Sequence, residues 1–475
     1  MKKTAQVWQV LVVAVVAIIT QFAFKKIKVC SANDNGLALR PPMGWRSWNL
    51  FGANVNQQLI ESVMEALARK EIRTMPDGSQ EMVSLCDIGY CNVGLDDGWQ
   101  ECGSARAAPG MNYHAKDGSP IVNITRFPDM RSMVDKAHSL GLTAGWYANN
   151  CICADQCHAN SEPNCEDMIR QDVDAFAQYG FDSYKLDGCG GETDLVMWNR
   201  YLNVTVKRPI LIENCHWGSV PPAIPNPSVP AAQGCPWNFY RSSGDVRASY
   251  ASVMQNLFTI FPLHDSKLSY PGCWAYPDML EVGCQHGPGG PSDPGLTFEE
   301  TRSHFGAWAI VSSPLTLSHD VSNKTVTDFL WPIISNKEVL EINGAYVGDS
   351  GGLYDSSPDS VNLSDAIFLG EGQSVTIPKY VYLYKPIGSK RIAVFLMNAS
   401  SATAQLTADF TKVPGLECNP KCSVRDVWKH EELGFFEKSF STTVLSHDAA
   451  FLVIQPVGGF QQHSSVHSMR WLSSW

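Results

Sequence analysis

Short apolar runs and helical patterns alternate along residues 41–317 of the chain. Segments 57–69, 129–140 and 166–179 carry apolar residues three and four positions apart, which predicts helices with one buried face. Between such segments lie β-rich runs, most of them followed by polar or Gly-rich residues. We predict eight strands, at 43–48, 91–95, 142–147, 181–186, 209–213, 239–244, 267–270 and 308–311.

Eight strands alternating with helices are typical of a (β/α)₈ TIM barrel in the α/β class, which we assign to residues 33–338. A doubly wound parallel sheet is the alternative, but it usually has a Gly-rich dinucleotide turn near its first strand, and this chain has none there. After the barrel, short alternating runs at 391–397, 404–410, 423–428 and 451–454 predict an antiparallel β-sandwich over residues 339–457.

The two ends of the chain have different compositions from the rest. Lys2 and Lys3 precede an apolar stretch, and the small residues of Cys30-Ser31-Ala32 fit a cleavage site, so residues 1–32 are predicted to be a signal peptide. The stretch 7–24 is 18 residues long, which leaves a signal anchor as the alternative. We expect a secreted or lysosomal/vacuolar protein, with a membrane-anchored form as the alternative. Residues 458–475 are aperiodic and predicted to be disordered.

The cysteine count agrees with export. The chain has 15 cysteines, and removal of Cys30 leaves an even number, as expected where cysteines pair in an oxidising compartment. Cys418 and Cys422 flank an Asn-Pro step and are predicted to close one turn. Five Asn-x-Ser/Thr sequons are candidates for glycosylation, at Asn123, Asn203, Asn323, Asn362 and Asn398.

The charge balance bears on the possible partners. Lys and Arg number 36 against 47 Asp and Glu, giving a net charge of −11, and the chain contains no long basic run. A chain of this charge repels polyanions, so we expect no nucleic-acid partner.

Carboxylates and aromatic residues gather where predicted strands end. The second, fourth and sixth strands lead into Leu95-Asp96-Asp97-Gly98-Trp99, Lys185-Leu186-Asp187-Gly188-Cys189 and Arg241-Ser242-Ser243-Gly244-Asp245. Aromatic residues accompany them at Trp45, Trp48, Tyr147 and Trp217. Each Asp alone could cap a helix and each Trp could fill the core. Together, at the mouth of a barrel, they favour a glycosidase, because sugars stack on indole rings and hydrolysis needs two carboxyl groups.

A metal hydrolase is a rival interpretation. Cys153, Cys157, His158 and Cys165 lie close together, as zinc ligands do. Cysteines at such density in an exported chain are more often disulfide-bonded, and no strand carries a His-x-His pair. The chain also lacks a phosphate-binding Gly-rich loop and a Gly-x-Ser-x-Gly motif. We therefore predict neither a metal nor a cofactor.

The strand-end motifs resemble the glycoside hydrolase family that contains lysosomal and plant α-galactosidases and α-N-acetylgalactosaminidases. The matching segments are LALRPPMGWRSWN (37–49), LDDGW (95–99), FPDMRSMVDKAHSLGLTAGWY (127–147), SYKLDGC (183–189) and YPDMLEVG (276–283). They cover the whole barrel in order, and the likeness extends into the β domain that this family also has.

The resemblance implies a retaining double displacement on α-galactosides in saccharides or glycoconjugates. Asp187 would be the nucleophile, and Asp245 would be the general acid and then the base. Lys185 would keep Asp187 ionised, whereas Asp245, facing that charge, would keep its proton longer. Trp48 would pack on the sugar, and Asp96 and Asp97 would bind the 4- and 6-hydroxyls. The pocket would also be lined by Tyr147, Lys185, Trp217, Arg241 and Met279.

The resemblance also implies two disulfides. Cys189 would pair with a cysteine of the loop after the third strand, for which Cys151 and Cys153 are both candidates because that loop is shortened. Cys215 would pair with Cys235.

Two positions depart from the family pattern. His216 stands where the family has Glu in α-galactosidases and Ser in α-N-acetylgalactosaminidases, the latter with a small residue at the position of Ser219. Tyr276 stands before Pro-Asp-Met where Asn-Asp is common. The imidazole of His216 can bind a 2-hydroxyl, so α-galactosides are the first expectation.

Alternative functions remain open. The same enzyme could act on α-N-acetylgalactosaminides or β-L-arabinopyranosides, although Asp96 and Asp97 together argue against a pentopyranose that lacks the 6-hydroxyl. A catalytically silent sugar-binding protein is a further alternative, which the presence of both Asp187 and Asp245 disfavours. The oligomeric state stays open, and a homodimer is one possibility.

Overall fold

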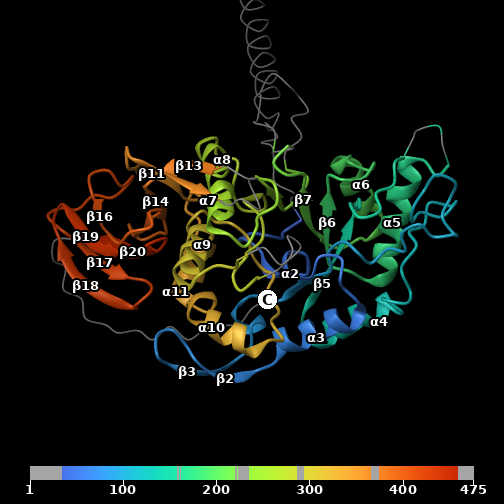
Figure 1. The fold of residues 1–475 in the computed structure, drawn as a ribbon, viewed down its shortest axis with the longest axis horizontal. Coiled ribbons are helices and arrows are strands. Elements are labelled where there is room, and N and C mark those ends of the chain that lie inside the picture. Colours follow the sequence, from blue (N-terminus) through green and yellow to red (C-terminus); the bar gives the residue numbers. More distant parts are fainter. Residues whose placement is uncertain are drawn as a thin grey trace, which may run out of the picture.

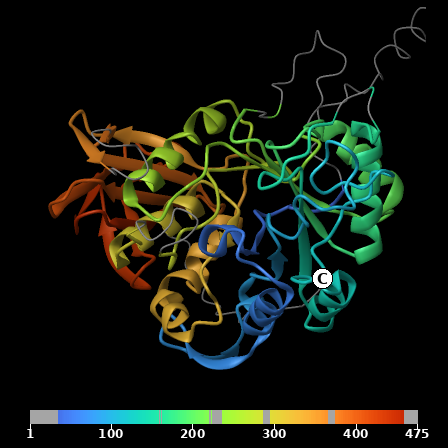
Figure 2. The same ribbon diagram turned by 45° about the vertical axis from the view of Figure 1, so that its right-hand side comes forward.

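The computed structural model describes residues 35–157, 160, 162–219, 222, 235–285, 294–364 and 374–457. The predicted signal segment 1–32, the tail 458–475 and His158 lie outside the described residues. The described chain forms a barrel with a β-sandwich at its side (Figure 1), and the same arrangement is visible after a turn of the view (Figure 2). Within the described residues, no helix has the length and apolar character needed to cross a membrane.

Eight parallel strands form the barrel sheet. In sheet order they are β10 (Leu315–Leu317), β1 (Met43–Arg46), β4 (Asn92–Gly94), β5 (Thr143–Ala148), β6 (Ser183–Asp187), β7 (Leu211–Cys215), β8 (Phe239–Arg241) and β9 (Trp274–Tyr276). After β9 the backbone N–H of Leu280 donates to the carbonyl of Thr316 in β10 at 2.8 Å, which links the two ends of the sheet. The predicted (β/α)₈ barrel is confirmed.

Ten helices surround the sheet in the described part of the chain. They are α2 (Trp48–Phe51), α3 (Gln57–Ala68), α4 (Met130–Ser139), α5 (Cys165–Tyr179), α6 (Leu195–Thr205), α7 (Tyr250–Phe258), α8 (Phe261–Asp265), α9 (Phe298–Ile310), α10 (Lys324–Ile334) and α11 (Lys337–Gly344). Asn56, Asp129 and Asn164 accept backbone N–H groups at the starts of α3, α4 and α5. These three are the helices that apolar spacing predicts, and they are confirmed.

Two predicted strands are wrong. The run 267–270 precedes a turn in which Tyr270 bridges only to Cys273, and the seventh strand is β9, four residues further on. The run 308–311 lies at the end of α9, and the eighth strand is β10. Helix α9 buries residues on every side, so its apolar run has no helical periodicity and cannot be distinguished from a buried strand by pattern.

The C-terminal domain is antiparallel, as predicted. Its larger sheet has the order β11 (Gly352–Ser356), β14 (Tyr380–Pro386), β15 (Ile392–Asn398), β20 (Ala449–Pro456), β17 (Cys422–Asp426) and β18 (Glu431–Phe436). Two strand pairs complete it: β12 (Ser360–Ser364) with β13 (Ser374–Pro378), and β16 (Ala404–Asp409) with β19 (Ser439–Val444). The Cys418–Cys422 disulfide is present.

Helix α9 of the barrel forms much of the contact between the two domains. It contacts β14, β15 and β20 on one side and other barrel helices on the other, and Figure 1 shows it between them. Arg302 of α9 pairs with Asp448, and Glu338 of α11 accepts two bonds from Arg425, at 2.8 and 2.7 Å. The β domain therefore packs on the barrel through α9 and α11.

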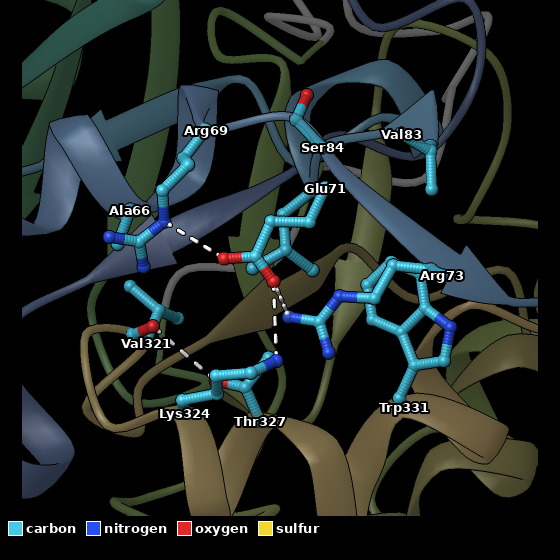
Figure 3. Close-up of a pocket in the computed structure, with 11 residues that line it drawn as sticks. Ala66, Arg69, Glu71, Arg73, Val83, Ser84, Val321, Lys324, Thr327 and Trp331 are labelled. Atoms are coloured by element: carbon cyan, nitrogen blue, oxygen red, sulfur yellow. Dashed lines mark hydrogen bonds and ion pairs between the residues drawn. The ribbon is translucent and has the colours of Figure 1, made fainter. Parts of the chain in front are cut away.

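A β-hairpin lies on the outside of the barrel, next to α10. In the pair β2 (Glu71–Thr74) and β3 (Gln80–Val83), Glu71 accepts from Arg69, Arg73 and Lys324, each at 3.2 Å. The Arg73 guanidinium lies 4.7 Å from the ring centre of Trp331 (Figure 3). These residues line a cavity of about 20 Å³, which has room for about one water, so we assign this pocket a structural role.

One glycosylation candidate is wrong. Asn398 is fully buried, and its side-chain amide donates to the carbonyls of Ala402, Val444 and Leu445, so a glycan would break these bonds and has no space. Asn203, Asn323 and Asn362 are exposed and Asn123 is half-buried, so these four remain candidates.

The contact of α9 with β15 can be tested at Gly306. A Cβ atom there would lie 2.4 Å from Cε2 of the buried Phe395 ring. We expect Gly306→Ala to lower the free energy of unfolding by about 1–3 kcal/mol in denaturant titrations, despite alanine's better helix propensity. Gly244→Ala is the control, because a Cβ at Gly244 meets open space. Equal stability of Gly306→Ala and wild type would contradict the packing described.

Candidate active site

Asp187 ends β6 at the mouth of the barrel and is held on several sides. Its carboxylate accepts from the Tyr147 hydroxyl at 2.9 Å and from the Gly188 N–H at 2.7 Å. Only 5% of its surface is exposed. Burial raises the pKa of Asp187 to about 6, against the opposing charge of Lys185. The group is thus a buried carboxyl whose ionisation falls in the weakly acidic range.

Lys185 lies two residues earlier on the same strand and faces the barrel interior. Its ammonium group donates to Asp96 at 2.8 Å and lies 5.1 Å from the centre of the Tyr147 ring. Asp96 is also 3.9 Å from the Arg46 guanidinium. The strand-end residues predicted from β4, β5 and β6 are therefore brought together.

Three polar residues inside the barrel, close to Lys185 and Asp96, were not predicted from the sequence to have a role in the site. Arg46 spans the barrel from β1 to β7, where it donates to Glu213 at 2.8 Å, and the Tyr276 hydroxyl donates to the same carboxylate. Both Arg46 and Glu213 are buried. A charged residue inside a predicted buried strand was the available signal, since such a charge needs a partner across the barrel.

The carboxylate of Asp97 accepts hydrogen bonds from several groups of the protein itself. Its carboxylate accepts from the backbone N–H groups of Cys151 and Ile152, at 2.9 and 2.8 Å, and from the side chain of Gln100 at 2.5 Å. Burial raises its pKa. Asp97 therefore shapes the loop after β5, in addition to any role toward a sugar hydroxyl.

Asp245 follows β8 and pairs with Arg241. The two side chains approach to 3.0 Å, and Arg241 lies at the same distance from the buried Asp278. The Trp217 indole also donates to Asp245. Burial pushes the pKa of Asp245 upward, but the charge and hydrogen bond of Arg241 outweigh it and leave the pKa below its usual value. The expected order is thus reversed: Asp187, not Asp245, has the higher pKa.

The loop after β7 presents two aromatic rings with different surroundings. His216 is buried, and its Nδ1 contacts the Asn214 oxygen at 2.7 Å, while Nε2 has no hydrogen-bond partner within the described part of the chain. Burial lowers the pKa of His216 to about 4, so the imidazole is neutral. Trp217, by contrast, is 41% exposed.

An apolar cluster extends from the first residues of β8 and β9 to the mouth of the barrel. The buried cluster of Phe239, Trp274, Tyr276 and Met279 packs against the half-buried Trp48. Of the predicted pocket residues, Met279 and Trp48 thus lie together on the side of β8, β9 and β1.

Disulfides tie the loops around the mouth. Cys189 pairs with Cys151, which decides between the two candidates, and Cys153 pairs with Cys102. Cys157 pairs with Cys165, so three of the four residues of the rival zinc cluster are disulfide-bonded and offer no thiolate.

The predicted Cys215–Cys235 disulfide is wrong. Cys235 pairs with Cys273, beside the start of β9. Cys215 keeps a free thiol at the end of β7, buried in the barrel with its sulfur 3.4 Å from Arg241. Its thiol contacts Asp187 as well, while the sulfur of Cys235 is already bonded to Cys273.

Comparison with known proteins agrees with this geometry. The profile of the family described as Alpha galactosidase A matches residues 40–345, and that of the Alpha galactosidase C-terminal beta sandwich domain matches residues 379–454. The chain belongs to the α-galactosidase A family. The expected family, and an enzyme of α-galactosidase type, are thereby confirmed.

Individual relatives align over most of the chain. It is similar to Alpha-galactosidase 3 of Arabidopsis thaliana, with 30% identity over 89% of this chain and 83% of that protein. An α-galactosidase of Cyamopsis tetragonoloba is 28% identical, over 89% and 88%.

Solved structures show the same fold. An α-galactosidase from Saccharomyces cerevisiae superposes with a TM-score of 0.67 at 20% identity, covering 90% of this chain and all of that one. A β-L-arabinopyranosidase from Geobacillus stearothermophilus gives 0.68 at 18% identity, over 90% and 100%.

Proposed function

We propose that this enzyme removes terminal α-linked galactose by double displacement through a covalent galactosyl ester of Asp187. The observation that carries the proposal is the meeting of two differently held carboxyl groups at one barrel mouth. Asp187 is buried behind Tyr147 and Lys185, whereas Asp245 is 58% exposed on Arg241. The relatives' names support α-galactosides as the substrate class.

In the first step, a carboxylate oxygen of Asp187 attacks the anomeric carbon while the Asp245 proton passes to the departing glycosidic oxygen. In the second step, Asp245 takes a proton from water, whose oxygen replaces Asp187 at the anomeric carbon. Two inversions give net retention. Lys185 and the Tyr147 hydroxyl stabilise the Asp187 carboxylate when it is released again.

Asp245 needs a proton for the first step although Arg241 lowers its pKa. A sugar and its leaving group bound over the exposed Asp245 would remove water from it, which raises the pKa of a carboxyl group. The proton that the pair shares then resides on Asp245, as the mechanism requires.

His216 is proposed to set the choice at the 2-position. Since Nδ1 faces the Asn214 oxygen and therefore donates, Nε2 is an acceptor; it is buried and has no partner in the described residues, so a sugar 2-hydroxyl that displaced the atoms covering it would satisfy it. An acetamido group is larger than this and would clash or leave its amide unpaired. The surroundings of His216 therefore favour galactose over N-acetylgalactosamine.

The fold and the disulfides fit export. Six disulfides occur in the described residues, which is typical of chains that fold in the secretory pathway. We propose an extracellular or lysosomal/vacuolar destination.

The nucleophile can be tested by substitution and labelling. We expect Asp187→Ala to lower kcat on an aryl α-galactoside by at least about 10⁴-fold, because the first step then has no nucleophile, with the fold retained by circular dichroism. A galactose-configured epoxide inhibitor should label the wild-type peptide that contains Asp187. A label elsewhere, with Asp187→Ala still active, would show that another residue attacks. Inert wild type that still binds galactose would indicate the silent sugar-binding alternative.

The pH dependence follows from the two pKa shifts. In the reactive form Asp187 is ionised and Asp245 is protonated, so the two carboxyl groups together hold one proton. Forms of the pair with one proton dominate at pH values between the two pKa values. Because the higher of these is about 6, kcat/KM should be bell-shaped and fall as pH rises through about 6.

A substrate with a strongly activated leaving group provides the control for this profile. Asp245→Asn should hydrolyse a dinitrophenyl galactoside with kcat/KM rising through about pH 6 to a plateau, because only Asp187 ionisation then matters. A wild-type plateau that continues well above neutrality would contradict the assigned protonation states.

The role of His216 can be tested with two substrates. Wild type should prefer the aryl α-galactoside over the matching α-N-acetylgalactosaminide. In the double variant His216→Ser, Ser219→Ala, the ratio of the two kcat/KM values should move toward the acetamido sugar by about 10-fold or more, because the ring no longer fills that space. Ser219→Ala alone is the control, since the Ser219 hydroxyl donates to the His216 carbonyl at 2.6 Å and leaves the imidazole ring in place. An unchanged ratio would show that His216 does not face the 2-position.

A further inference from the structure

Asn149 lies one residue beyond β5 and has no place in the mechanism above. It is completely buried, and its φ of 57° is in the left-handed region. Asparagine accepts this conformation more readily than most residues. The backbone thereby turns the side chain of Asn149 from the end of β5 toward the loop that follows β6.

The amide group of Asn149 bridges the two ends of that loop. Its nitrogen donates to the backbone carbonyl of Asp187 at 2.7 Å, and its oxygen accepts the backbone N–H of Glu192 at 3.0 Å. Both amide atoms are thus used, and both hold the segment that begins with the nucleophile.

The peptide group between Asp187 and Gly188 is therefore held from both sides. Its carbonyl is bound by Asn149, and its N–H donates to the Cys215 carbonyl at 3.1 Å and to the Asp187 carboxylate at 2.7 Å. A rotation of this peptide plane would swing the N–H away from the carboxylate. The Asn149 amide resists that rotation.

Gly190 is shaped to the Asn149 amide. A Cβ atom at Gly190 would lie 2.1 Å from the Asn149 oxygen, closer than any real contact. The φ of Gly190 is outside the left-handed region, so the close approach of Asn149, and not the backbone conformation, requires glycine here.

We propose that Asn149 is a positioning residue for the nucleophile. By fixing the Asp187–Gly188 peptide it orients the Asp187 carboxylate for attack, without touching the substrate itself. This inference rests on the proposed function, in which Asp187 is the nucleophile. Misplacement of a reacting group by about 1 Å can cost about 100-fold in rate, so a remote amide can matter for turnover.

The first test is Asn149→Gly, which permits the left-handed backbone and removes only the amide. We expect kcat on an aryl α-galactoside, and the rate of labelling of Asp187 by the galactose-configured epoxide, to fall together by about 10- to 100-fold. KM should stay within about 3-fold, because the sugar-binding side chains are untouched. The total amount of label bound at the end of the reaction gives the concentration of folded active sites, and the maximal rate is divided by it to obtain kcat. If Asn149 served only the fold, the substitution would lower that concentration and leave kcat per active site unchanged.

The second test uses Gly190→Ala in two backgrounds. In wild type the added methyl group should displace the Asn149 amide and reproduce the loss in kcat. In Asn149→Gly the clash is absent, so the same substitution should cost less than about 3-fold, a non-additivity that identifies the contact. Gly190→Ala in the wild-type background also tests the proposal if Asn149→Gly fails to fold.

The outcomes separate this inference from the proposed function. Wild type that hydrolyses the galactoside, together with variants that keep its kcat and labelling rate, overturns the positioning role and leaves the proposed function standing. A loss confined to KM, or equal costs of Gly190→Ala in both backgrounds, also overturns it. Wild type without hydrolysis or labelling at Asp187 overturns the proposed function, and the positioning role with it.

Discussion

The ion pair between Lys185 and Asp96 sets the conditions for the rest of the barrel mouth. Both groups are buried, and a buried charge is tolerated only with a partner and well-placed hydrogen bonds. The pair joins β6 to the loop after β4, and the same rule operates between Arg46 and Glu213 and between Arg241 and Asp278. Each pair links a strand to another strand or to the loop that follows one, so an arrangement of the sheet that separated any pair would leave a buried charge without its partner. Removing one partner of such a pair is strongly destabilising, because it leaves an uncompensated buried charge.

The different protonation of the two carboxyl groups follows from this pairing. Arg241 directly contacts Asp245 and keeps it ionised, whereas Lys185 is engaged by Asp96 and reaches Asp187 only through its field. Sequence reasoning placed Lys185 correctly beside Asp187, but adjacency on a strand does not show which carboxylate receives the hydrogen bond. That depends on side-chain direction across the barrel, which the spacing of residues does not contain.

The success of the sequence reasoning varied with how local the signal was. The helices 57–68, 130–139 and 165–179 have one polar face, so their periodicity identified them, and the Asp residues after β4, β6 and β8 could be placed by the rule that strand ends meet. The segment of helix α9 was predicted wrongly as a strand, because burial on every side removes the helical periodicity of its apolar residues. The partner of Cys235 was predicted wrongly, because the pairing with Cys273 depends on the direction in which each sulfur points at the end of its strand. Asn149 was missed because its role rests on a backbone conformation.

The departures from the family pattern belong to one connected part of the site. Tyr276 donates to Glu213, which also binds Arg46, and Cys215 lies two residues after Glu213 on β7, followed by His216. The Tyr276 hydroxyl is thus satisfied by a carboxylate that is itself neutralised by a guanidinium, so a change of Glu213 or Arg46 alone would leave a buried charge without its partner. In contrast, Lys185 and Asp187 lie in the segment 183–189, which matches the family. The departures at β7 and β9 thus belong to a set of polar groups whose charges are balanced among themselves, separate from the strand end that carries Lys185 and Asp187.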